Sequence, residues 1–286
     1  MENKTRQYGF LFDEPSPEHY VFGSFGNVPM TVLNPSRDWR PYLPVKEYQS
    51  LIQETFACVL FTILNCVEIL IKKKYGIEKN YSDIFLAKLL ETQQNGGSSP
   101  QKAAELLRKA GVPPEEVWGI EHLFTEIPQE IITEALKFRE EYEFLHDFVV
   151  PNHTAITSAL ECSPLLISVP AWFKNTEGVY YRPTGMTDNH ATTLVYEEQG
   201  EFLQVFDSYA DSEVDPSLKE LDWSISPMVV KRFWIKRREE VPIKSCFKTF
   251  LEAFWGNKKE NRLIGLPSRG TDSRVSQSSR SIVTGQ

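Results

Sequence analysis

The feature that most constrains the fold of this chain is a long apolar run from Ala57 to Ile71, interrupted by few polar side chains. The run is only 15 residues long and contains Glu68, whereas a membrane span needs about 20 apolar residues. Three lysines and Gly76 follow it, which is the usual pattern at the C-terminal end of a helix. We therefore expect a helix buried in the core of a soluble globular protein.

A cysteine begins this helix, and a histidine and an aspartate follow far downstream in strand-like surroundings. Cys58 precedes His190 by 132 residues, and His190 precedes Asp207 by 17 residues. A helix N-terminus lowers the pKa of a thiol, and an imidazole holds the resulting thiolate as an ion pair. This order of groups is what an acyl-transfer enzyme with a cysteine nucleophile requires. We expect Cys58 to be the nucleophile, His190 the general base and acid, and Asp207 the residue that orients the imidazole.

The composition argues against several classes of protein. A net charge of −8 and a pI near 5.3, without a basic stripe, argue against nucleic-acid binding. The four cysteines form no Cys-x-x-Cys pair or Cys/His cluster, so we expect neither a disulfide framework nor a metal site, and no cofactor. The N-terminus lacks the apolar stretch of a secretory signal, which predicts a cytoplasmic protein, or a virion-associated one if a phage encodes it. Nothing in the sequence indicates the oligomeric state.

Helical patterns dominate the first half of the chain and strand patterns the second half. The expected helices are the run that begins at Cys58 and the segments 82–92, 100–110, 128–147 and 154–161. The expected strands are 164–170, 191–196, 202–206 and 228–235, of which the second and third form a hairpin. This order predicts an α+β fold with the active site at the junction of the two halves.

Several short blocks along the chain occur in the same order in one family of enzymes. The blocks are Asp38-Trp-Arg40, Val45-Lys-Glu-Tyr-Gln49, Ala57-Cys-Val-Leu-Phe-Thr62, Asn95-Gly-Gly97, Asn189-His-Ala191 and Phe206-Asp-Ser-Tyr209. Together they resemble the papain-like (C1-type) cysteine peptidases, and more closely the divergent phage and bacterial members than the lysosomal ones. The gap between Cys58 and His190 also falls within the roughly 130–150 residues expected of that family.

The resemblance implies a papain-like fold, in which a helical N-terminal half packs on an antiparallel sheet or barrel-like half, with the active site between them. It implies hydrolysis of peptide or isopeptide bonds in a polypeptide substrate through a thioester on Cys58. We expect this domain to span residues 38–255. Residues 1–37 are expected to form an extended segment, as a pro-segment or a plain structural strap, and the Ser/Arg-rich residues 256–286 a disordered tail.

The family places a glutamine shortly before the nucleophile, where its side-chain amide stabilises the oxyanion together with the N–H of the nucleophile. Here Gln49 lies nine residues before Cys58, and Gln53 lies five before it. We expect Gln49 to fill this role because its Val-Lys-x-x-Gln context matches the family, with Gln53 as the other candidate.

The family motifs also imply residues that contact the substrate or protect the site. Gly96 and Gly97 would pair their backbone with a bound peptide, and Asn189 would contribute to substrate binding. Tyr209 stands where the family has a tryptophan, and it would shield the hydrogen bond of the His190 imidazole.

Departures from the family pattern leave two alternatives open. Val59 replaces the tryptophan that usually follows the nucleophile, and the glutamine is displaced. One alternative is therefore a non-catalytic papain-like protein with a structural or binding role, for example in a phage particle. The other is a cell-wall amidase of the Cys-His type. Asp207 replaces asparagine, which the chemistry permits because a carboxylate accepts a hydrogen bond from the imidazole N–H.

Overall fold

The computed structural model of the protein describes residues 8–13, 21–22, 28–198, 200–209 and 218–238. The expected disordered tail, residues 256–286, lies outside the described residues, as does Cys246. Within the described ranges, no helix is both long enough and apolar enough to cross a membrane.

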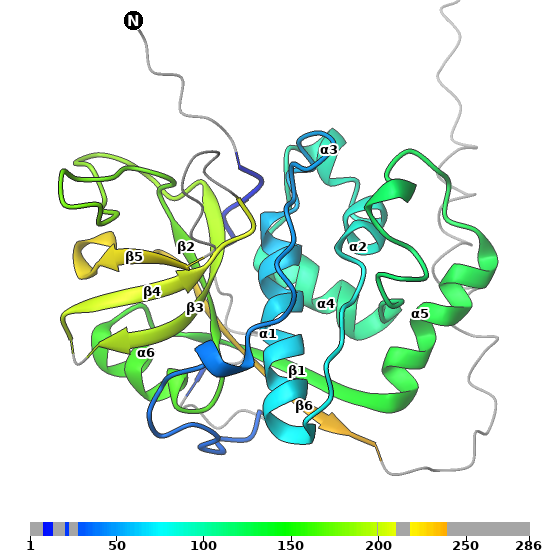
Figure 1. Cartoon of the computed structure of the whole chain (residues 1–286), viewed down its shortest axis with the longest axis horizontal. Coiled ribbons are helices and arrows are strands. Elements are labelled where there is room, and N and C mark those ends of the chain that lie inside the picture. Colours follow the sequence, from blue (N-terminus) through cyan, green and yellow to red (C-terminus); the bar gives the residue numbers. More distant parts are fainter. Residues whose placement is uncertain (1–7, 14–20, 23–27, 199, 210–217, 239–286) are drawn as a thin grey trace, which may run out of the picture. The chain divides into compact units, whose positions relative to one another are not determined.

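The expected core helix is α1 (Cys58–Tyr75), which stands at the centre of the described fold (Figure 1). Every residue of α1 from Cys58 to Ile71 is buried, because strands β2, β3 and β6 pack on it from one side and helices α2 and α4 from the other. The helix ends at Gly76, whose φ of 66° is the left-handed conformation that glycine adopts without strain, and whose N–H donates to the Lys72 carbonyl.

The remaining helices of the first half gather on the side of α1 opposite to strands β3 to β5 (Figure 1). These helices are α2 (Asp83–Leu89), α3 (Thr92–Asn95), α4 (Pro100–Ala110) and α5 (Gln129–Glu141). The expected start of α4 is confirmed, because the Ser99 side chain accepts a hydrogen bond from the Lys102 N–H and Pro100 takes the first helical position. A further helix, α6 (His153–Leu160), belongs to the second half.

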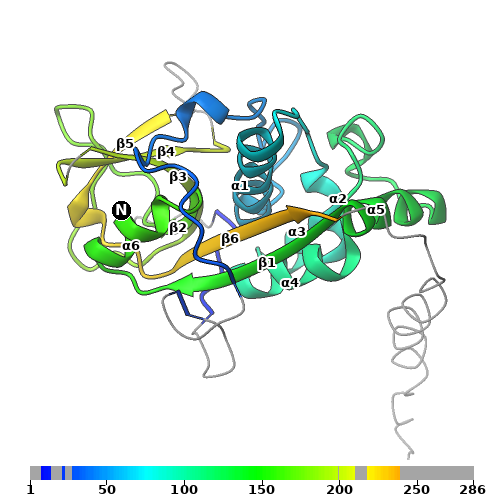
Figure 2. The ribbon, with the colours of Figure 1, turned by 90° about the horizontal axis from the view of Figure 1, so that it is seen from below.

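The second half forms one open antiparallel sheet in the order β1-β6-β2-β3-β4-β5. Its strands are β1 (Tyr142–Val149), β2 (Leu165–Val169), β3 (His190–Glu198), β4 (Phe202–Phe206), β5 (Leu218–Asp222) and β6 (Val230–Arg237). Figure 2 shows β1 and β6 side by side. The α+β class and the antiparallel second half are as expected, and the sheet takes the open form rather than a closed barrel.

Two local predictions are wrong. The helix expected over 128–147 ends at Glu141, and the chain continues as strand β1. The reason is that Tyr142 and Phe144 alternate with less buried side chains and pair across to β6, so a non-local partner overrides the local helical pattern. Strand β5 was not expected at all, and it extends the sheet beyond β4.

Candidate active site

The helix that carries Cys58 and the strand that carries His190 pack directly against each other. Cys58 is the first residue of α1 and His190 the first residue of β3, and both are fully buried. The backbone N–H of Ala191 donates toward the Cys58 sulfur. Further along both elements, the Thr193 hydroxyl lies 3.4 Å from the Thr62 carbonyl oxygen and donates to it. The structure thus brings the expected thiol and imidazole to one end of the contact between α1 and β3.

His190 uses only one of its two ring nitrogens for a hydrogen bond within the described residues. Its Nε2 lies 2.6 Å from Oδ1 of Asp207, which follows the end of β4. A carboxylate only accepts hydrogen bonds, so Nε2 carries the proton. The other nitrogen, Nδ1, is buried without a hydrogen-bond partner in the described part of the chain. Nδ1 is therefore not engaged by any hydrogen bond from the described residues.

The second oxygen of Asp207 is bound by a lysine that the sequence did not suggest. Nζ of Lys219, on β5, donates to Asp207 Oδ2 at 2.7 Å and to the Tyr209 carbonyl oxygen at 2.8 Å. Burial alone would raise the pKa of Asp207, but the charges of His190 and Lys219 and their hydrogen bonds lower it below its ordinary value. Asp207 is accordingly a buried carboxylate with both oxygens occupied.

Gln49 lies beside the site and is fully buried, whereas Gln53 is exposed. The Gln49 side-chain oxygen accepts a hydrogen bond of 2.8 Å from the hydroxyl of Ser208, the residue after Asp207. Its Nε2 donates to Glu54 Oε1 at 3.2 Å and to the Tyr8 carbonyl oxygen at 3.4 Å. Of the two candidate glutamines, the structure brings Gln49 to the site.

The expected lowering of the thiol pKa at the start of α1 is present, but burial outweighs it. Burial raises the pKa of Cys58 far above its ordinary value, and the charges of Asp207 and Glu54 raise it further. Hydrogen bonds from the N–H groups of Ala191 and Val59 act in the opposite direction but are outweighed. Burial thus favours the neutral thiol of Cys58 over the thiolate.

Residues 8–13 lie over the site and contribute to its closure. The ring of Tyr8 is 5.5 Å from that of His190 and 5.1 Å from that of Tyr209. The Gly9 carbonyl oxygen accepts from the Ser98 N–H at 3.0 Å, and the Leu11 N–H donates to the Ser98 carbonyl oxygen at 3.1 Å. The segment is therefore bound by its backbone as well as by aromatic contacts.

Two glycines permit this close approach. A Cβ atom on Gly9 would overlap the Phe56 carbonyl, and a Cβ atom on Gly97 would overlap the Gly9 carbonyl. Both glycines also have positive φ angles, 104° and 133° respectively. Gly96 and Gly97 were expected to pair their backbone with a bound peptide; in the structure, residues 9 and 11 of the chain itself pair with Ser98, directly after Gly97.

The other expected binding residues have different surroundings. Gly96 caps α3 with a φ of 69° and has no atom near its missing side chain. The Asn189 side-chain oxygen accepts from the Ala171 N–H at 2.8 Å, which fixes the backbone next to His190. The Tyr209 ring packs edge-on against the imidazole, with centroids 5.2 Å apart.

Sequence reasoning missed three residues around the imidazole. Tyr8 and Trp172 each place a ring within 5.5 Å of the His190 ring, and Lys219 binds Asp207. Of these, only Lys219 had a usable signal, because it shares the buried face of its strand with Leu221 two residues later.

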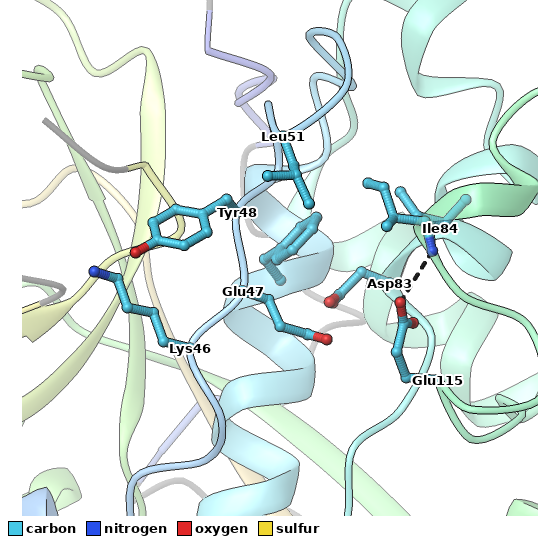
Figure 3. A pocket seen from close by; sticks show the side chains of 9 residues that line it. Lys46, Glu47, Tyr48, Leu51, Asp83, Ile84 and Glu115 are labelled. Atoms are coloured by element: carbon cyan, nitrogen blue, oxygen red, sulfur yellow. Dashed lines mark hydrogen bonds between the residues drawn. The ribbon is translucent and has the colours of Figure 1, made fainter. Parts of the chain in front are cut away.

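A cavity of about 130 Å³ lies beside α1 and α2 and is lined by none of Cys58, His190 and Asp207 (Figure 3). The carboxyl groups of Glu47, Asp83 and Glu115 converge on it. Burial, followed by the charge of Glu47, raises the pKa of Glu115 to about 8, and the same causes raise the pKa of Asp83. Within the described residues, no group of histidine, cysteine and acidic side chains has the arrangement of a metal site.

A cysteine at the start of a buried helix, beside a sheet-borne histidine and its carboxylate, defines a papain-like fold with its thiol and imidazole at the interface of the two halves. Comparison with solved structures agrees. The chain is similar to xylellain, a cysteine protease of Xylella fastidiosa, with 16% identity, a TM-score of 0.61, and coverage of 83% of this chain and 98% of that one.

It is also similar to procathepsin L 3 of the Tenebrio molitor larval midgut, with 12% identity, a TM-score of 0.54, and coverage of 72% and 71%. The bromelain protease of Ananas comosus follows, with 17% identity, a TM-score of 0.50, and coverage of 71% and 98%. At these identities the likeness shows the fold alone. Neither a family model nor a curated protein matches the chain.

Proposed function

We propose that the protein is a cysteine peptidase that hydrolyses peptide or isopeptide bonds through a thioester on Cys58. The observation that carries this proposal is the His190–Asp207 hydrogen bond of 2.6 Å, which leaves Nδ1 without a partner among the described residues, while the N–H of the next residue, Ala191, donates toward the Cys58 sulfur. The papain-like fold of the neighbours, all of them cysteine proteases, supports the same class of reaction.

The proposed reaction has two steps. His190 Nδ1 takes the proton of the Cys58 thiol, and the thiolate attacks the carbonyl carbon of the substrate. The imidazolium then protonates the leaving amine, which departs and leaves a thioester. Water, deprotonated by His190, attacks the thioester and releases the acid and the thiol. The Cys58 N–H and the Gln49 side-chain amide would stabilise the oxyanion in both steps.

Residues 8–13 would act as a cover that must leave before substrate enters. Direct contacts support this role. Tyr8 packs on the His190 ring, and the backbones of Gly9 and Leu11 form hydrogen bonds with the backbone of Ser98. The Tyr8 carbonyl also engages the Gln49 amide that would serve the oxyanion. Departure of the segment would free that amide and hydrate the thiol, which lowers the cost of forming the thiolate.

One rival is a non-catalytic papain-like protein, and the buried neutral thiol favours it. A cell-wall amidase would use the same thiol and imidazole on a different substrate. Incubation with an unfolded protein and, separately, with peptidoglycan distinguishes the amidase from the peptidase, because each enzyme releases products from only one of the two.

The test of the proposal is labelling by a thiol-directed peptidyl epoxide, combined with a peptidase assay. Cys58→Ala should abolish both signals. Cys66→Ala is the matched control, since Cys66 is a buried cysteine of the same helix, two turns further on, and should leave both signals intact. Equal labelling of wild type and Cys58→Ala would refute the assignment of Cys58 as nucleophile.

A further inference from the structure

A buried lysine is the least expected member of the constellation around His190. Lys219 is 2% exposed, and both contacts of its ammonium are short: Asp207 Oδ2 at 2.7 Å and the Tyr209 carbonyl oxygen at 2.8 Å. The Trp172 ring lies 5.2 Å from Nζ and 5.4 Å from the imidazole centroid, so it borders both groups. Burying an ammonium is expensive unless a partner compensates its charge. Asp207 is that partner.

The lysine alters how strongly the charge of Asp207 stabilises the protonated His190 ring. A lone buried carboxylate beside His190 would strongly stabilise the imidazolium, and so would hold on the ring a proton that the leaving amine must receive. An asparagine at the same position would accept the Nε2 hydrogen bond without adding charge. With Lys219 bound to Oδ2, the Asp207 carboxylate still accepts from Nε2 through Oδ1, while its charge is balanced by the ammonium.

We propose that Lys219 is a positioning residue of the active site, whose ammonium neutralises and fixes Asp207 so that the pair serves His190 as a neutral hydrogen-bond acceptor. The inference rests on the proposed function, since it concerns the same imidazole. It identifies why this chain can carry an aspartate where the resembling family has an asparagine.

The other charged and titratable groups near the imidazole do not supply this balance. Cys58, at the start of α1, accepts from the N–H of Ala191, the residue after His190, and Tyr8 and Tyr209 pack on the ring from the covering segment and from the end of β4. Glu54 adds a negative charge close to Cys58. Among the described residues, the side chains that bond to Asp207 are those of His190 and Lys219, and of the two the lysine is the one that brings an ammonium group.

The test follows the His190 ring by NMR as a function of pH, with the signal assigned by its absence in His190→Ala. In Lys219→Met, the unbalanced carboxylate should keep the imidazolium protonated, so the midpoint of the His190 titration should rise by about one pH unit or more. The double variant Lys219→Met/Asp207→Asn should return the midpoint to the wild-type value, because the asparagine restores a neutral acceptor. Lys219→Arg, which keeps the charge, should remain near the wild type.

A buried lysine elsewhere controls for general effects of losing such a residue. Lys231 of β6 is fully buried and donates to Gln101 at 2.8 Å, so Lys231→Met should leave the His190 midpoint unchanged. If Lys219→Met does not fold, the double variant carries the test alone. A midpoint that is unmoved or lower in Lys219→Met, or a double variant that fails to fold or to titrate like wild type, would overturn the role of Lys219. The titration needs no turnover, whereas failure of the proposed function would appear as absent Cys58 labelling in wild type.

Discussion

Gly9→Val should open the site, and the size of the effect follows from the contacts of the covering segment. A side chain at Gly9 overlaps the Phe56 carbonyl and requires a φ of 104° that valine avoids. The segment then loses its two backbone hydrogen bonds to Ser98, worth about 1 kcal/mol each. It also loses the ring contacts of Tyr8 with its two aromatic neighbours, worth about 0.5–1 kcal/mol each.

These losses add up to roughly 3–4 kcal/mol, which corresponds to a 100-fold or larger increase in the open population, since about 1.4 kcal/mol is a factor of ten. The assay is the rate of Cys58 alkylation by iodoacetamide, read by mass spectrometry, with buried Cys66 as an internal reference. Gly185→Val is the matched control, because Gly185 also has a positive φ, 79°, but has open space around its missing Cβ. The reasoning fails if Gly9→Val and Gly185→Val alkylate at the same rate.

Three further predictions concern stability. The pKa of Glu115 is raised to about 8, so the folded protein keeps a proton on this carboxyl that the unfolded chain loses near pH 4.5. The contribution of Glu115 to the free energy of unfolding is therefore fully present below pH 4.5 and is lost as the pH rises through 8. Glu115→Gln should therefore unfold in urea with a free energy about 1–2 kcal/mol higher than wild type at pH 8.5, a value reduced for partial hydration, and show no gain at pH 4. Arg232→Met should lower stability by about 3–5 kcal/mol, because it strands buried Asp147, which the arginine binds through two hydrogen bonds of 2.9 and 2.7 Å; a calorimetric Tm within 2 °C of wild type would contradict this. Trp39→Phe should cost about 1–3 kcal/mol, measured in the same denaturation experiment, since it leaves the Leu160 carbonyl without its 2.8 Å donor.

Local signals were sufficient for much of the fold. The position of α1 follows from its apolar run and Gly76, and that of α4 from Ser99 and Pro100. In each case the deciding interactions lie within a few residues of one another. Residues of β1 were wrongly assigned to a helix for the opposite reason. Their partner strand, β6, comes much later in the chain, and no local sequence pattern indicates that pairing.

The candidate site divides in the same way. Cys58, His190 and Asp207 were predicted together because their residue types, order and motifs are informative; in the structure Asp207 bonds to the His190 ring, and the N–H of Ala191, the next residue, donates toward Cys58. Lys219 was missed because its strand, β5, was not predicted, and without the strand nothing indicated that the lysine shares a buried face with Leu221. The role of Lys219 depends on its bond to the Asp207 carboxylate, and the two residues meet only in the folded sheet.

The strand order makes the last described strand, β6, the one on which assembly depends. It enters the sheet between β1 and β2, both made much earlier, and it covers part of α1. A nascent chain that stops before residue 230 therefore leaves two strand edges unpaired and an apolar helix uncovered. Such a product would be a substrate for quality control rather than a smaller folded protein, and translation must run past β6 before the sheet can be completed.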